Sequence, residues 1–250
     1  MELTVLGSAG TWPPAGGATC GYLVSHEGSH LWLDAGTGTF ANLQQHIEVR
    51  DISAIVISHG HPDHFVDVVP AFYARHYGGL GDPGLPFYSP QGFTNLLSLL
   101  VSEDGRDVMG QAYTFTTLVH GDRVQVGPFD IRAYEMRHVG VEALGYRIQA
   151  GNAVLAYTGD TGPCDAVVEM ARDADVLMAE ATYQDASNVL PFHLSARQAA
   201  EHAKAAGAGR LLLTHIQPTL DAAVSLAEAR SEFDGPVELA EQGMVTVIGS

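Results

Sequence analysis

The sequence predicts an α/β protein in which helices cover β-sheets, that is, a layered sandwich. Three observations support this fold class. The chain has 250 residues, of which 46% are hydrophobic and 16% charged, so it can bury a substantial core. Short apolar runs, turns with glycine or proline, and helical segments alternate along the whole chain. No linker or low-complexity tract interrupts them. We therefore expect one domain over residues 1–250, with two halves at roughly 1–120 and 121–250.

The first half is expected to begin with strands. Short apolar runs predict them, and the turn Glu27-Gly28-Ser29 separates the second from the third. The run ISAIVISH is apolar enough to be a buried strand. Two longer segments predict helices, although Pro70 lies inside the first and should kink it. The expected strands are 3–7, 20–25, 30–36 and 52–59, and the expected helices are 65–77 and 89–101.

The second half mixes strands and helices in the same way. Its first two strands are expected around Gly127-Pro128, and the next two form a hairpin that turns at Gly151-Asn152. Ser195 and Gln198 form a capping-box pattern that opens a helix, which Gly207 or Gly209 would close. The ranges of these elements are 122–138 for the first strand pair, 144–160 for the hairpin, 175–181, 210–215 and 243–249 for further strands, and 221–233 for a helix, with another helix after Pro163.

The charge and the composition exclude several classes of function. Asp and Glu number 29 against 12 Lys and Arg, a net charge of −17, and Lys204 is the only lysine. A protein that grips a long nucleic acid needs many clustered cations, so a small substrate is expected instead. No apolar run is long enough to span a membrane and no signal peptide is visible, so the cytoplasm is the expected location. Cys20 and Cys164 are far apart and outside any C-x-x-C, which predicts neither a disulfide framework nor a thiolate zinc site.

Histidine and aspartate gather where apolar strands end. The segment SHGHPDH places His59, His61, Asp63 and His64 directly after the strand at 52–59. Three further strand ends carry such a residue, namely His138, Asp160 and His215. Strands that end at the same sheet edge would bring these side chains together. Imidazole and carboxylate donors suit Zn²⁺, Mn²⁺ or Fe, and seven of them suit two ions about 3.5–4 Å apart.

Less specific interpretations exist for each of these residues. The cluster at 59–64 is alternatively a polar turn rich in histidine by chance. His138 and His215, taken singly, are more commonly structural histidines, and Asp160 before Thr-Gly is also typical of a turn. The metal-site interpretation is favoured because each of these residues follows an apolar strand, in the right order along the chain.

At this point the sequence resembles the metallo-β-lactamase superfamily, and more narrowly its ribonuclease Z-like phosphodiesterase branch. The resemblance covers nearly the whole chain, and residues 59–64 match the family motif H-x-H-x-D-H. It implies a four-layer αββα sandwich with two divalent metal ions, zinc or alternatively manganese, at one edge between two βα halves. A homodimer is also implied. The implied ligands are His59, His61 and His138 for the first ion, Asp63, His64 and His215 for the second, and Asp160 as the bridge.

Two more segments are similar to motifs of this branch. Glu180 lies in AEATY and His193 opens HLSARQAAEHA. The resemblance implies that Glu180 orients His193, which protonates the leaving oxygen, while Asp63 helps to orient the attacking water. A histidine suits the acid role because its ordinary pKa lies near neutrality. A surface histidine before a capped helix is the alternative for His193.

The sequence therefore predicts a dinuclear metal-dependent hydrolase that cleaves phosphodiester bonds of a small substrate such as a cyclic nucleotide. One alternative is a ribonuclease Z-type tRNA 3′-processing endonuclease. The compact elements between Asp160 and His215 leave no room for the tRNA-binding arm of those enzymes, which speaks against it. A second alternative is a lactone or thioester hydrolase on the same metals. A non-catalytic metal-binding or scaffold protein is the third, and it would need a broken ligand set.

Overall fold

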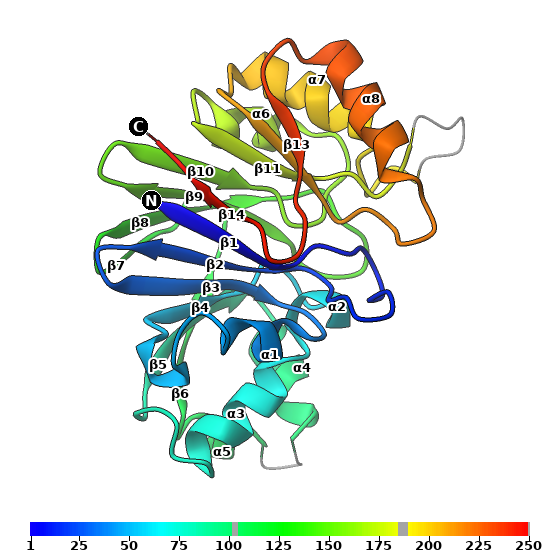
Figure 1. Ribbon diagram of the computed structural model, residues 1–250. Coiled ribbons are helices and arrows are strands. Elements are labelled where there is room, and N and C mark those ends of the chain that lie inside the picture. Colours follow the sequence, from blue (N-terminus) through cyan, green and yellow to red (C-terminus); the bar gives the residue numbers. More distant parts are fainter. Residues whose placement is uncertain (102–104, 185–189, 250) are drawn as a thin grey trace.

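Two β-sheets lie face to face in the computed structural model, which describes residues 1–101, 105–184 and 190–249 (Figure 1). Within those residues each sheet has seven strands, in the orders β14-β1-β2-β3-β4-β5-β6 and β13-β12-β11-β10-β9-β8-β7. The first sheet consists of β1 (Glu2–Gly7), β2 (Gly21–His26), β3 (Ser29–Ala35), β4 (Ala54–Val56), β5 (Leu85–Pro90), β6 (Tyr113–Leu118) and β14 (Val245–Val247). The second consists of β7 (Arg123–Val126), β8 (Phe129–Glu135), β9 (Leu144–Ala150), β10 (Ala153–Tyr157), β11 (Val176–Glu180), β12 (Leu211–Thr214) and β13 (Val237–Leu239).

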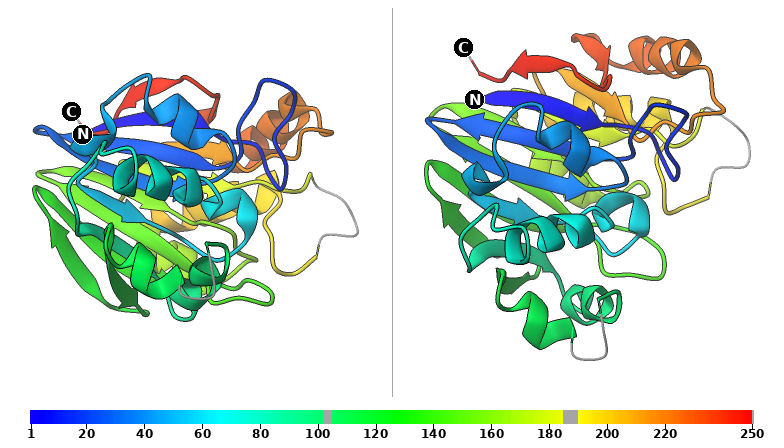
Figure 2. Two further views of the ribbon diagram at one scale, coloured as in Figure 1. Left: turned by 90° about the horizontal axis from the view of Figure 1, so that it is seen from below. Right: turned by 60° about the horizontal axis from the view of Figure 1, so that its bottom comes forward.

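Helices cover the outer face of each sheet and make four layers in all (Figure 2). On the first sheet these are α1 (Thr39–Leu43), α3 (Val68–His76), α4 (Phe93–Leu99) and α5 (Gly105–Met109), and on the second they are α6 (Asp165–Ala171), α7 (Ala196–Ala206) and α8 (Ala222–Glu232). The short α2 (Pro62–Phe65) lies at one edge of the sandwich, after a 3₁₀ turn at Val49–Asp51 and strand β4. No described helix is long and apolar enough to cross a lipid bilayer.

Three apolar clusters hold the layers together. The central cluster lies between the sheets, and there the rings of Tyr22 and Tyr157 meet edge to face with centroids 5.3 Å apart. A second cluster joins α6, α7 and α8 to the second sheet, and a third joins α1, α3 and α4 to the first. The predicted αββα sandwich is therefore confirmed, because apolar side chains fill each space between neighbouring layers.

Local signals in the second half gave correct elements. The hairpin turns at Gly151, whose φ of 58° favours glycine. Ser195 accepts a hydrogen bond from the backbone N–H of Gln198, whose side chain accepts one from the Ser195 N–H, so the capping box is present. Gly207, with φ of 67°, ends α7. The choice left open between Gly207 and Gly209 is thereby decided.

Two helix predictions in the first half were wrong in their bounds. Residues 65–77 do not form one kinked helix, because α2 ends at Phe65 and α3 begins at Val68. Pro70 is the third residue of α3, where its missing N–H removes no intrahelical bond. The helix expected from residue 89 begins at Phe93 instead, since Ser89 and Pro90 belong to β5. Elements α1, α5, β5, β6 and β13 were not predicted.

One strand from the end of the chain belongs to the sheet of the first half. Strands β1 to β6 build the first sheet and β7 to β13 the second, but β14 returns to pair antiparallel with β1. The division into halves near residue 120 stays a prediction, as does the single domain. In both sheets the parallel strands β3 to β6 and β10 to β13 end at the edge where α2 lies, so their following loops meet there.

Candidate metal centre

The motif at 59–64 occupies the turn between β4 and α2. His59 and His61 lie in this turn, and His61 is the N-cap residue of α2. Pro62 takes the first helical position, where its fixed φ favours the start of a helix. Asp63 and His64 follow within the helix. Four potential ligands therefore come from one tight strand-to-helix connection, which is rigid enough to hold them in place.

The three remaining predicted ligands follow strands of the second sheet. His138 follows β8, Asp160 follows β10 and His215 follows β12. The backbone of His215 has φ of 55°, a left-handed conformation that non-glycine residues rarely adopt. Its N–H donates to the carbonyl of Ser8, which fixes this strained turn against the loop after β1.

His59, His61 and His138 form the first of two neighbouring groups, here called the three-histidine pocket. His61 Nδ1 lies 3.2 Å from His59 Nε2 and 3.0 Å from His138 Nε2. Burial is the largest cause that lowers the pKa of all three rings, and for His59 the pKa falls well below its usual range. The three rings are therefore neutral near pH 7, which is the state that binds metals.

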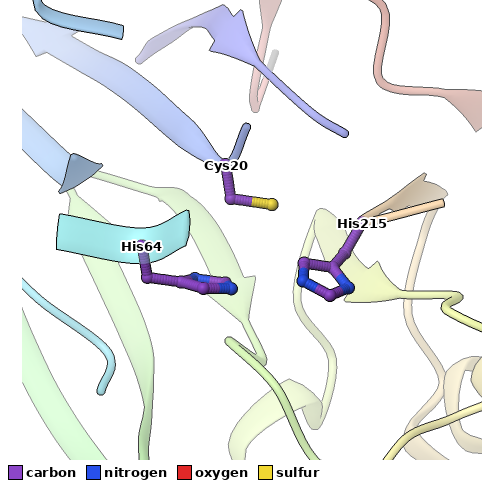
Figure 3. Close-up of side chains that lie close together, drawn as sticks. All are labelled: Cys20, His64 and His215. Carbon is purple, nitrogen blue, oxygen red and sulfur yellow. The ribbon is translucent and has the colours of Figure 1, made fainter. Parts of the chain in front are cut away.

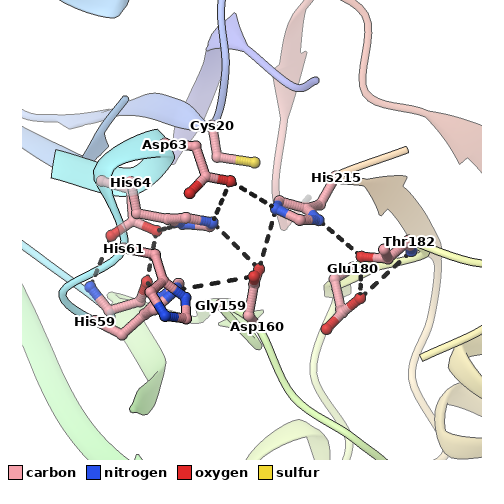
Figure 4. Close-up of polar contacts among 12 residues, drawn as sticks. Cys20, His59, His61, Asp63, His64, Gly159, Asp160, Glu180, Thr182 and His215 are labelled. Carbon is pink, nitrogen blue, oxygen red and sulfur yellow. Dashed lines mark hydrogen bonds and ion pairs between the residues drawn. The ribbon is translucent and has the colours of Figure 1, made fainter. Parts of the chain in front are cut away.

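Asp63, His64 and His215 form the second group, the mixed pocket (Figure 4). Asp63 Oδ2 lies 3.2 Å from His215 Nε2 and 3.6 Å from His64 Nε2. Burial acts to lower the pKa of both histidines here too, but the carboxylates of Asp160 and Asp63 outweigh it and raise the pKa of each, that of His64 well above its usual range. The presence of carboxylates therefore reverses the direction of the shift.

Asp160 lies between the two pockets and faces each with one oxygen. Oδ2 lies 3.8 Å from His59 Nε2 and 3.9 Å from His138 Nε2. Oδ1 lies 3.2 Å from His64 Nε2 and 3.4 Å from His215 Nε2. Burial would raise the pKa of Asp160, but the surrounding histidines hold it well below its usual range. A carboxylate shared in this way has the position of a bridging ligand.

Hydrogen bonds fix the orientation of the rings in the mixed pocket. His64 Nδ1 lies 2.8 Å from a carboxylate oxygen of Asp34, which can only accept, so Nδ1 carries the proton. Thr182 donates its hydroxyl proton to Glu180, at 2.5 Å, and therefore accepts from His215 Nδ1, 2.8 Å away. In both rings Nε2 is left to face the pocket.

The same logic applies to two rings of the three-histidine pocket. Ser58 donates its hydroxyl proton to Asp34, at 2.7 Å, so its oxygen accepts from His59 Nδ1 at 3.0 Å. His138 Nδ1 donates to the carbonyl of Phe192 at 2.9 Å. The Nε2 atoms of His59 and His138 therefore present lone pairs inward, toward His61 Nδ1.

Buried polar atoms without partners indicate that this donor set fits a cation. His64 Nε2 and Asp160 Oδ1 are buried and have no hydrogen-bond partner among the described residues. A buried polar atom left unsatisfied costs about 1–3 kcal/mol. Nitrogen and oxygen donors that converge in this way are typical ligands of zinc and manganese. The residues therefore fit divalent metal ions, while their assignment as ligands stays a prediction.

His193 and Glu180 lie next to the same site. Glu180 is fully buried at the end of β11, and His193 precedes α7. His193 Nδ1 lies 2.9 Å from Glu180 Oε1 and 3.8 Å from Asp160 Oδ2. Burial acts to lower the pKa of His193, but the hydrogen bond and charge of Glu180 raise it above its ordinary value. The expected carboxylate–histidine pair is thus present, with its Nδ1 directed at Glu180.

A cavity of about 600 Å³ lies beside the histidine turn, although none of the predicted ligands lines it. Gly60, between two of the histidines, contributes to its wall together with Phe93, Leu96, Gly140 and Val141. A Cβ atom at Gly60 would lie 3.0 Å from Leu96 Cδ2, so glycine lets the histidine turn pack closely against this wall. The cavity is largely apolar and has room for a small organic group.

Sequence reasoning missed several residues that support the ligands. Asp34 is fully buried, with φ of 53°, and accepts hydrogen bonds from Ser58 and from Tyr157 in addition to His64. Thr182 connects Glu180 to His215. Asp34 had a signal of its own, a carboxylate at the end of the apolar run HLWLD. Nothing in the sequence distinguishes Thr182 or Ser58 from ordinary hydroxyl residues.

The chain is similar to a known protein family, to several relatives and to a solved structure. A family model described as a beta-lactamase superfamily domain matches residues 29–216. The chain is 32% identical to the probable metallo-hydrolase YhfI of Bacillus subtilis, over 98% of this chain and 99% of that protein. It is 27% identical to ribonuclease Z of Myxococcus xanthus, over 97% and 96%. The crystal structure of the metallo-beta-lactamase fold protein YhfI from Bacillus subtilis matches with a TM-score of 0.89 at 28% identity, covering 99% of both chains.

Proposed function

The chain belongs to the beta-lactamase superfamily and is a metallo-hydrolase of that fold, and from this premise we propose that it hydrolyses phosphodiester bonds of small substrates at a centre for two metal ions. One observation carries the proposal. Imidazole nitrogens in two adjacent pockets face inward on both sides of Asp160, whose two oxygens face one pocket each. Such an arrangement favours two cations with a shared carboxylate.

The ligands divide between the pockets as their distances suggest. The three-histidine pocket would hold one ion and the mixed pocket the other, with Asp160 common to both. When bound, divalent cations such as Zn²⁺ or Mn²⁺ lower the pKa of water and offset negative charge that develops on phosphoryl oxygens. Buried groups that hydrogen-bond to the ligands, above all Asp34, hold the rings in the orientation that this binding needs.

His193 is proposed as the acid that protonates the leaving oxygen. Glu180 takes its Nδ1 side, which leaves Nε2 as the nitrogen that presents a proton to the substrate. The charge of Glu180 also favours the protonated ring. Asp63 is proposed to orient the attacking water, because its Oδ2 is held by the backbone N–H of Thr11 at 3.0 Å beside the mixed pocket.

A phosphodiester substrate is supported by the relative from Myxococcus xanthus, because a ribonuclease cleaves such bonds. The small size of the substrate is supported by the cavity of about 600 Å³ and by the net charge of −17. A cyclic nucleotide meets both requirements, since its base is small enough for the largely apolar cavity beside Gly60. Cytoplasmic location and a homodimer stay predictions.

The same relative favours a second candidate, a tRNA 3′-processing endonuclease. Its alignment with this chain extends over 298 positions, although the chain has only 250 residues. The relative therefore carries segments that this chain lacks. Electrostatics also disfavours the candidate, because binding to tRNA phosphates draws most of its free energy from clustered cations.

The test is an assay of the purified protein, with its metals quantified, on four substrates. These are bis(p-nitrophenyl) phosphate, 3′,5′-cyclic nucleotides, a precursor tRNA and a lactone. We expect hydrolysis of the first two, with loss of activity on chelation and recovery on adding Zn²⁺ or Mn²⁺.

Each other outcome identifies a rival function. Efficient cleavage of precursor tRNA with a steep salt dependence would establish the endonuclease instead. Hydrolysis of the lactone alone, undiminished in a His193→Ala variant, would establish an ester hydrolase that does not use His193 as an acid.

A further inference from the structure

Cys20 is a buried cysteine in the wall of the mixed pocket. It directly precedes β2 and is fully buried. Its Sγ and one ring nitrogen each of His64 and His215 all lie within 4.8 Å of one another. Figure 3 shows the sulfur pointing to the space between the two rings. Zinc–sulfur and zinc–nitrogen bonds of about 2.3 and 2.0 Å place two donors of one tetrahedral ion roughly 3.5 Å apart. One ion could therefore bind all three atoms after the side chains move inward by up to about 1 Å.

The hydrogen bonds around the sulfur favour negative charge on it. The Tyr22 hydroxyl donates to Cys20 Sγ at 3.4 Å. Thr214 Oγ1 lies 2.5 Å from the Tyr22 oxygen, and either hydroxyl can be the donor of that bond. The acceptor for a thiol proton, the carbonyl of Ala9, lies 3.9 Å away. The Tyr22 hydroxyl dipole thus points toward the sulfur, whereas the sulfur's own donor bond is long.

A second and independent observation points to a ligand at this place. His64 Nε2 faces the same space, belongs to a ring that is 0% exposed, and has no hydrogen-bond partner among the described residues. Asp160 Oδ1, buried and equally without a hydrogen bond, lies 3.2 Å from it. A cation at this place would contact both atoms and the sulfur as well.

We propose that Cys20 is a sulfur ligand of the ion in the mixed pocket, together with Asp63, His64, His215 and Asp160. The proposal rests on the dinuclear centre proposed above. Burial raises the pKa of the free thiol to about 12, so the sulfur keeps its proton until a cation displaces it to solvent. This departs from the sequence-based expectation that the chain has no thiolate metal site.

A sulfur donor has a consequence for the choice of metal. Thiolates select Zn²⁺ and other soft or borderline ions, whereas Mn²⁺ is suited by oxygen donors. The mixed pocket should therefore discriminate against Mn²⁺ more strongly than its two carboxylates and two imidazoles would alone. The three-histidine pocket, which has no sulfur, should bind zinc and cobalt without any sulfur signature.

The experiment is optical titration of the metal-free, full-length protein with Co²⁺. Cobalt bound by nitrogen and oxygen gives visible d–d bands, and cobalt bound by a thiolate adds an intense sulfur-to-metal charge-transfer band in the near ultraviolet. We expect both in the unmodified protein. In Cys20→Ser we expect the d–d bands without the charge-transfer band, and affinity for one Zn²⁺ equivalent reduced at least roughly 10–100-fold, the loss typical of weaker outer contacts.

Cys164→Ser is the matched control, because Cys164 is the other cysteine of the chain and lies beside Thr161 at 3.6 Å. The charge-transfer band should persist in it. Since the chain has two cysteines, persistence there assigns the band to Cys20 even if the Cys20→Ser protein fails to fold.

Three results would overturn the proposal, and they differ in what else they affect. Two bound cobalt ions with d–d bands but no charge-transfer band would exclude sulfur ligation while leaving the dinuclear centre intact. A charge-transfer band that persists in Cys20→Ser would have the same effect. Failure to bind cobalt at all would refute the metal centre itself, and the sulfur ligand with it.

Discussion

The three-histidine pocket and the mixed pocket use the same side chain in opposite electrostatic settings. In the first, burial lowers the pKa of every ring. In the second, the nearby carboxylates raise the pKa of His64 and His215 although both rings are fully buried. The difference teaches that histidine alone does not define a metal position. The neighbouring carboxylates decide the net charge of each pocket, and that charge influences which ion the pocket favours.

The largest effect is expected where the two pockets meet. Asp160→Asn weakens the one side chain common to both, so we expect fewer than two metal ions per chain and hydrolysis of bis(p-nitrophenyl) phosphate reduced on the order of 10³-fold or more. Metal analysis and steady-state kinetics measure these. Asp165→Asn, at the exposed start of α6, is the control and should match the unmodified protein. Retention of two ions with nearly full turnover would remove Asp160 from the centre.

Emptying each pocket separately tests whether they are distinct. His138→Ala and His215→Ala should each retain one zinc ion per chain and lose roughly 10²–10³-fold in turnover. The Co²⁺ spectra should differ, because only the His138→Ala protein keeps the mixed pocket and its sulfur band. Identical spectra in the two variants would mean that the pockets do not act as separate positions.

A His193 variant tests proton donation to the leaving group, which neither pocket supplies. In His193→Ala we expect a loss of about 10²-fold on substrates with poor leaving groups. Bis(p-nitrophenyl) phosphate, whose leaving group needs no protonation, should be affected much less. Metal content should stay unchanged. Equal losses on both kinds of substrate would show that His193 is not the acid.

Replacing Asp34 should have a smaller effect, which differs between the two pockets. It contacts His64 directly but reaches His59 only through Ser58. In Asp34→Asn we expect zinc affinity to fall roughly 10–100-fold at the mixed pocket and less at the three-histidine pocket. Competition with a chromophoric chelator measures both affinities. A larger loss at the three-histidine pocket would reverse this ranking.

Much of the site could be predicted because its residues follow strands. His138, Asp160 and His215 each stand where an apolar run stops, and parallel strands of one sheet end at one edge. The residues that hydrogen-bond to the predicted ligands were not predictable in the same way. Ser58 and Thr182 matter only because of what lies across from them in space, and no spacing in the sequence records that. Cys20 was set aside because thiolate sites were expected in C-x-x-C pairs.

The fold was predictable where local signals were complete. The capping box at Ser195 and the turn at Gly151 gave correct elements. Strand β5 was missed because LPFYSP carries two prolines, which usually disfavour a strand between two neighbours. The helix assigned to its end was therefore begun too early. Pro70 misled in the opposite sense, because only the observed start of α3 shows that it lies in a first turn.

The most direct test of the dinuclear centre is anomalous diffraction from crystals of the zinc-loaded protein, with data on both sides of the zinc absorption edge. Two anomalous peaks should appear about 3.5–4 Å apart, one among His59, His61 and His138, the other among Asp63, His64 and His215, with Asp160 between them. A single peak, or peaks away from these side chains, would contradict the account.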